Sequence, residues 1–125
     1  LSNPAVRNNR LDILVDLDPR LQYEGLIRLA VSEWNGWADN VTVATTTDRS
    51  RADVTIQARC VRRTPDMGWY RASERLILYN SCLMDHPGGK FGSQGRIDPT
   101  PASRKARTVI HEIGHALGLD HTDSN

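Results

Sequence analysis

The C-terminal stretch VIHEIGHALGLDHTDSN, residues 109–125, holds three of the four histidines of the chain. On a helix, His111 and His115 lie one turn apart on the same face. Gly118 lets the chain leave such a helix in a left-handed turn, which swings His121 back toward the first two histidines. The stretch therefore predicts a helix that ends in a cluster of imidazole side chains.

This cluster has the composition of a zinc site. A catalytic zinc ion takes three protein ligands plus water, and its bonds to imidazole nitrogen are about 2.0–2.1 Å long. Glu112 follows His111 and can approach that water as a general base without binding the metal. Each residue alone could be a surface residue, a core residue or a cap, but the string HExxHxxGxxH needs five fixed residues at once. We predict one Zn2+ bound by His111, His115 and His121.

The preceding chain predicts strands and one further helix. Residues 1–10 are interpreted as a polar lead-in, and Asp18-Pro19 as a helix start. Apolar residues then recur at helical spacing up to Trp34. Branched and alternating runs predict strands at 11–18, 41–47, 52–60, 69–73 and 75–82. The order is strand, helix, four strands, long loop and helix, which predicts an α/β or α+β domain with the first helix on one side of a sheet.

Length and composition favour a single domain over residues 1–125. The net charge of +1 gives no reason to expect a nucleic acid or an acidic membrane as partner. No apolar run approaches the roughly 20 residues of a membrane span. The N-terminus carries no secretory signal, and because Leu1 is not Met we take the chain as processed or excised. We expect a monomer.

Two cysteines, Cys60 and Cys82, each end a strand-like run. If the two runs are neighbours in a sheet, the sulfurs can form a disulfide worth roughly 3 kcal/mol. The alternative is two buried free thiols in a cytosolic protein. The disulfide is the favoured interpretation.

The segment HEIGHALGLDH, residues 111–121, resembles the zinc-binding helix of matrixin-type metzincin endopeptidases. A weaker similarity covers AVSEWNGWADNVTVATTTDRSRADVTIQ, residues 30–57. The small secreted bacterial snapalysins have a similar layout, although they carry aspartate at the position of His121. The likeness covers roughly residues 11–121, and only the zinc helix is highly specific.

The resemblance implies a zincin-like fold, with a twisted, mostly parallel sheet of about five strands and two long helices. It implies a secreted zinc endopeptidase in which Glu112 activates a zinc-bound water. The substrate, a peptide or protein, is expected to bind as an extended strand along residues 69–73 or the start of 75–82.

The chain departs from the family after the third histidine. Metzincins have a turn with a methionine below the metal, followed by a last helix, whereas this chain ends at Asn125 and has Met67 and Met84 upstream. We expect the methionine turn and last helix to be lacking or supplied by a separate C-terminal segment. Met84 is expected in the core rather than under the site. The departure leaves an alternative function, a zinc-stabilised but inactive peptide- or protein-binding domain.

A second metal site is a further expectation from the resemblance, because matrixins carry structural calcium. Asp85, His86 and Asp98 flank the Gly-rich loop and are the candidate residues for a structural Ca2+. A surface loop without metal is the alternative.

Overall fold

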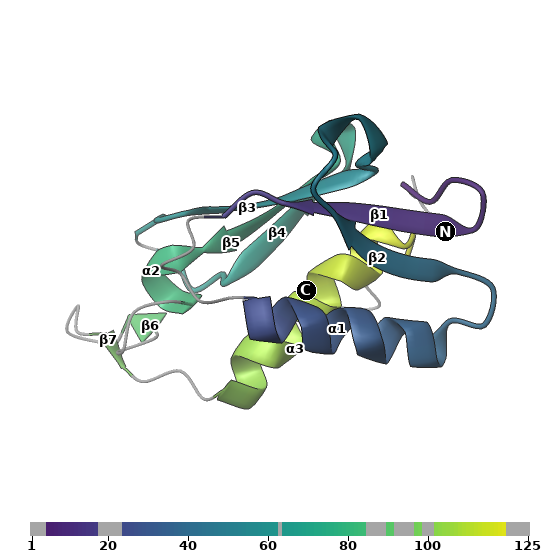
Figure 1. The fold of residues 1–125 in the computed structure, drawn as a ribbon. Helices are drawn as coiled ribbons and strands as arrows, with labels where there is room; N and C mark the ends of the chain where they lie inside the picture. The colour runs from purple at the N-terminus through teal and green to yellow at the C-terminus, as the bar shows by residue number, and fades with distance from the viewer. Residues whose placement is uncertain are drawn as a thin grey trace.

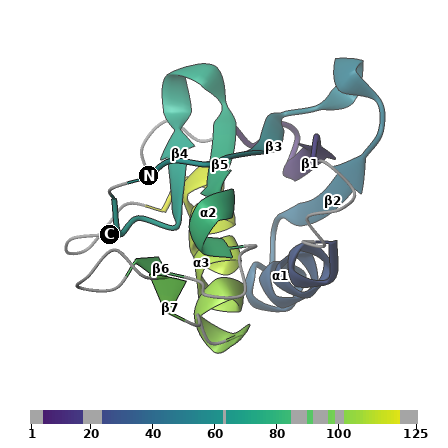
Figure 2. The ribbon, with the colours of Figure 1, turned by 90° about the vertical axis from the view of Figure 1, so that its left-hand side faces the viewer.

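The computed structural model describes residues 5–17, 24–62, 64–84, 90–91, 97–98 and 102–119. These residues form an α/β domain in which a five-stranded sheet has both long helices against one face (Figure 1). The view in Figure 2 also places both helices on the same side of the sheet. The elements are β1 (Arg10–Val15), α1 (Glu24–Trp37), β2 (Thr42–Thr46), β3 (Val54–Arg59), β4 (Gly68–Arg71), β5 (Leu76–Asn80), α2 (Ser81–Met84), β6 (Lys90–Phe91), β7 (Ile97–Asp98) and α3 (Ala102–Ala116).

The sheet is mostly parallel, with strand order β2-β1-β3-β5-β4. The first four strands in that order pair in parallel, and β4 pairs antiparallel with β5 at one edge. The chain reverses between β4 and β5 through a short 3-10 turn that ends at Arg75, whose φ of 49° is left-handed. This reversal makes β4 an edge strand and keeps β5 inside the sheet. The predicted α/β class and strand number are confirmed.

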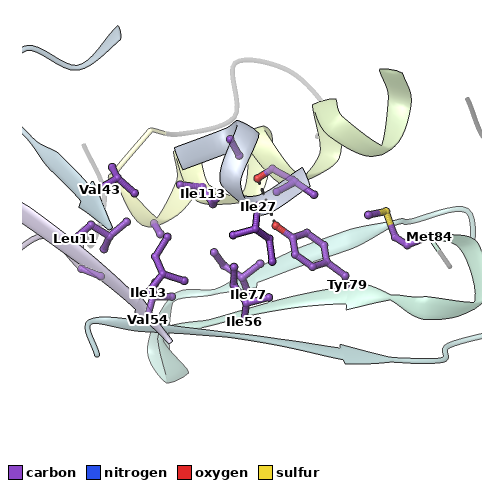
Figure 3. Packing of buried hydrophobic residues seen from close by; sticks show 14 residues of the cluster. Leu11, Ile13, Ile27, Val43, Val54, Ile56, Ile77, Tyr79, Met84 and Ile113 are labelled. Atoms are coloured by element: carbon purple, nitrogen blue, oxygen red, sulfur yellow. Dashed lines mark hydrogen bonds between the residues drawn. The ribbon is translucent and has the colours of Figure 1, made fainter. Parts of the chain in front are cut away.

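The core lies between the sheet and the two helices (Figure 3). Branched side chains on alternate strand positions meet Ile27 of α1 and Ile113 of α3. Tyr79 of β5 is fully buried, and its hydroxyl donates to the carbonyl of Val109 at 3.4 Å. Met84 is buried at 1% exposure, so its predicted place in the core is confirmed.

The two long helices approach closely where Trp34 meets α3. The indole Nε1–H of Trp34 donates to the carbonyl of Ile110 at 2.9 Å. A Cβ on Gly114 would lie 2.8 Å from Cζ2 of Trp34, so this position accepts only glycine without a shift of the helices. The position of α3, which carries the histidine motif, is therefore set by its packing on α1.

The N-terminal segment differs from the prediction of a polar lead-in. Ala5 is buried and its N–H donates to the carbonyl of Ala116, and Arg7 and Arg10 exchange backbone hydrogen bonds. Asn8 and Asn9, which lie between these two arginines, both adopt positive φ angles, a conformation that asparagine tolerates in a tight turn. The predicted lead-in is therefore wrong for the described residues 5–10, because local turn chemistry and Ala5 burial tie them to the domain.

The strand boundaries also shift by a few residues. β1 ends at Val15, and β5 ends at Asn80, where the helical turn α2 takes over. The predicted helix start at Asp18-Pro19 lies outside the described residues. Within the described part of the chain, none of the helices has the length and apolar character that a membrane crossing requires.

The disulfide between Cys60 and Cys82 is present. Cys60 directly follows β3, and Cys82 lies in α2 directly after β5. Because Arg59 and Asn80 are partners in the β3–β5 ladder, the two cysteines are neighbours, with Cα atoms 4.8 Å apart. The prediction from the two strand-like runs is confirmed, although Cys82 sits in a helical turn.

Candidate functional site

The histidine-bearing helix ends in a Schellman turn. The N–H of Gly118 donates to the carbonyl of His115, and that of Leu119 donates to the carbonyl of Gly114, each at 3.0 Å. Gly118 has a φ of 102°, which is unfavourable for residues with a side chain. The predicted left-handed exit at Gly118 is confirmed, and it turns the carbonyl of Leu119 back toward the last turn of α3.

The two histidines on α3 face each other. Their Nε2 atoms are 3.0 Å apart, and their rings are nearly perpendicular with centroids 4.5 Å apart. Nδ1 of His115 lies 2.7 Å from the carbonyl oxygen of Leu119. A carbonyl only accepts, so this contact assigns the proton to Nδ1 and leaves the lone pair of Nε2 directed at His111.

This geometry fits a metal ion. Two nitrogens that bind one tetrahedral zinc ion at about 2.0–2.1 Å lie about 3.3 Å apart, close to the 3.0 Å between the two Nε2 atoms. Metal-binding histidines usually donate their other ring N–H to a carbonyl or carboxylate, as His115 does to Leu119. The pair therefore presents two of the three predicted nitrogen ligands.

The third predicted ligand, His121, lies outside the described residues. Within the described ranges, no group of three or more His, Cys, Asp or Glu side chains is placed to hold a metal ion. Asp85 and His86 of the predicted second metal site also lie outside these ranges, as does the side chain of Asp98. Both metal sites therefore stay predictions.

Glu112 points away from solvent, with only 4% of its surface exposed. Burial, followed by the negative charge of Asp66, raises the pKa of its carboxyl to about 7. A carboxyl with this pKa can both accept and release a proton near neutral pH, as a general acid–base group must. Glu112 and His111 line the same cavity, so this carboxyl lies near one imidazole of the pair.

A cavity of about 240 Å³ opens beside Glu112. One wall comes from the N-terminal side of the α3 motif and the other from the segment that leads into β4. The lining residues are Pro65, Asp66, Met67, Gly68, Arg107, Thr108, His111 and Glu112. The sequence predicted no functional residue between the strands at 52–60 and 69–73, so this second wall was missed.

Gly68 sets how closely β4 approaches the α3 wall. A Cβ at this position would lie 3.0 Å from Cδ1 of Tyr79 and 3.3 Å from Cγ of Glu112. Such contacts would displace Glu112 or the start of β4. Glycine at the first residue of β4 therefore allows Glu112 and the edge strand to lie side by side.

The backbone of β4 is available at the edge of the described sheet. Asn80 donates its N–H to the carbonyl of Met67 at 2.8 Å, which makes these two residues a hydrogen-bonded pair of the antiparallel ladder. Because such pairs alternate, Gly68 and Tyr70 direct their backbone N–H and C=O groups away from β5. The open edge thus runs alongside the cavity.

The chain matches no family model, and no curated protein matches it.

Proposed function

We propose that this chain is a zinc-dependent endopeptidase of the metzincin type, with His111, His115 and His121 as zinc ligands and Glu112 as the catalytic base. The observation that carries the proposal is the facing pair of Nε2 atoms, 3.0 Å apart, next to a buried carboxyl in a cavity. The HExxHxxGxxH motif, which begins on α3, supplies His121 from the sequence as the proposed third nitrogen donor.

The ligands suit zinc because two or three neutral imidazoles and a rigid helix favour a borderline-soft ion in a tetrahedral site. The chemistry that this ion supplies when bound is Lewis acidity, toward a carbonyl oxygen and toward a water molecule. The Leu119 carbonyl orients the ring of His115 and keeps Nε2 unprotonated for this role.

Glu112 moves the protons of the reaction. A carboxylate oxygen of Glu112 accepts a proton from water as the hydroxide adds to the scissile carbonyl carbon. The same carboxyl then donates that proton to the amide nitrogen as the C–N bond breaks. The pKa of about 7, raised by burial and by Asp66, suits both transfers near neutral pH.

The substrate binds as an added strand along β4. The outward backbone groups of Gly68 and Tyr70 would pair with an extended peptide beside the cavity that Glu112 lines, and this supports the proposal. The sequence allowed either residues 69–73 or the start of 75–82 to bind the substrate strand. β4 suits this role because it lies at the edge of the described sheet, whereas β5 lies between β3 and β4.

An extracellular or other oxidising compartment suits the protein, because the Cys60–Cys82 disulfide persists there and is rare in the reducing cytosol. Secretion is therefore part of the proposal.

The test combines metal analysis with cleavage of an unstructured protein such as casein. Protein purified without chelator should contain about one zinc per chain, and a chelator should abolish cleavage until zinc is restored. His115→Ala should lose both zinc and cleavage, whereas Arg28→Ala, which changes an exposed side chain on α1, should lose neither. Zinc binding without cleavage of any substrate would favour the inactive binding domain instead, and a metal-free active protein would refute the proposal.

A further inference from the structure

The side chain of Asn80 holds the cavity wall opposite Glu112 from the β5 side. This residue ends β5 and is fully buried. Its Nδ2 donates to the carbonyls of Val61 at 2.8 Å and Asp66 at 3.1 Å. Its Oδ1 accepts from the N–H groups of Val61 at 3.0 Å and Cys82 at 3.3 Å. All four hydrogen-bonding positions of the amide are therefore used.

These bonds hold both ends of the segment that connects Val61 to Met67. Val61 is where the segment leaves β3 and the disulfide, and Asp66 and Met67 are where it enters the cavity wall. The backbone N–H of Asn80 adds a bond to the carbonyl of Met67. A segment tied at both ends to a buried strand has little freedom left to lose when a ligand binds.

We propose that Asn80 is a positioning residue for substrate binding, which holds Asp66 and Met67 so that the cavity is formed before the peptide arrives. The proposal rests on the proposed function, because it assigns the cavity to substrate. Asn80 acts through the wall alone, since its bonds go to Val61, Asp66, Met67 and Cys82 and not to the groups on α3.

The substitution Asn80→Asp tests the two hydrogen bonds that Asn80 donates to the carbonyls of Val61 and Asp66. Aspartate keeps the size of the side chain and the two accepted bonds, but it sets a carboxylate oxygen against the carbonyls of Val61 and Asp66. The matched control is Asn35→Asp on α1, because the Asn35 amide bonds the N–H and C=O of Val43 in the same way, at 2.7 and 2.9 Å.

Asn80→Asp should raise KM about tenfold, the effect of losing one to two hydrogen bonds that preorganise the site. Zinc affinity and kcat should stay within about twofold of the wild-type values. The substitution weakens the binding of substrate and of transition state equally, so KM rises while kcat is unchanged. Asn35→Asp should leave KM within about twofold. An unchanged KM in folded Asn80→Asp, or an equal rise in Asn35→Asp, would overturn the proposal.

Amide hydrogen exchange provides a readout that needs neither activity nor a folded variant. In the unaltered protein, the Val61 amide should exchange about 100-fold or more slowly than an unstructured amide, since its N–H donates to buried Asn80. Fast hydrogen exchange at the Val61 amide would show that Asn80 does not hold this segment, and would overturn the proposal. If the Val61 amide exchanges slowly but the protein cleaves no substrate, the proposed function is wrong, and so is the role of Asn80 in substrate binding. The hydrogen bonds by which Asn80 holds the cavity wall would then still be confirmed.

Discussion

The two edges of the described sheet differ in what their backbones meet. At the β2 edge, the side chain of Asn35 bonds both the N–H and the C=O of Val43. At the β4 edge, Gly68 and Tyr70 turn their backbone groups outward beside the cavity that holds Glu112. An edge strand can receive another strand only where its backbone is free. The difference is that Asn35 covers Val43 at the β2 edge, whereas the outward backbone groups of Gly68 and Tyr70 lie beside the cavity that Glu112 and His111 line.

Removal of the proposed base, Glu112, is the change with the largest expected effect. Glu112→Gln keeps the size of the side chain but cannot accept the proton of water, so kcat should fall about 10²-fold or more. Zinc content should be unchanged, because Glu112 is not a proposed ligand. The control is Glu33→Gln on α1, which should cleave normally. Wild-type turnover by Glu112→Gln would show that another group is the base.

A scan of substrate backbone amides tests whether β4 receives a strand. Single N-methyl groups placed along a cleaved peptide should lower kcat/KM about five- to tenfold at alternate positions, because each removes one hydrogen bond to β4. Positions between them should be affected much less. A scan without this alternation would mean that the peptide does not pair with the β4 edge.

The close approach of β4 to Glu112 is tested at Gly68. In Gly68→Ala the new Cβ would press on Tyr79 and Glu112. We expect kcat/KM to fall about fivefold and the free energy of unfolding to fall by about 1 kcal/mol. Gly36→Ala on α1 is the matched control, since a Cβ there meets nothing within 4 Å. It should be neutral or stabilising by up to about 1 kcal/mol. Equal effects of the two variants would remove Gly68 from this account.

The smallest effect is expected at the β2 edge. Asn35→Ala removes both bonds to Val43 and should lower the free energy of unfolding by about 1 kcal/mol, measured by denaturant titration. The kinetic constants should not change, because this edge is remote from the cavity in the strand order. A clear rise in KM would mean that the two edges do not act independently.

Local chemistry made much of the fold predictable from sequence. The alternating and branched runs predicted five strands, the spacing of His111 and His115 predicted α3, and Gly118 predicted its left-handed exit. The Cys60–Cys82 disulfide was predictable because both cysteines follow strand-like runs. Each of these signals lies within a few residues of the feature that it predicts.

The direction of β4 and the second cavity wall were not predictable in this way. The reversal depends on Arg75, a residue type that carries no turn signal, in a left-handed conformation. The wall depends on Asn80, which meets Val61 and Asp66 from a distant part of the chain. The only hint was an asparagine at the end of an apolar strand, where this residue type is depleted.

Zinc titration of metal-free protein tests the central claim most directly. Cleavage of an unstructured protein and bound zinc are measured at each addition. The account predicts no cleavage without zinc, a rise in proportion to zinc bound, and saturation at about one zinc per chain. Full cleavage by the metal-free protein, or saturation with zinc without any cleavage, would contradict it.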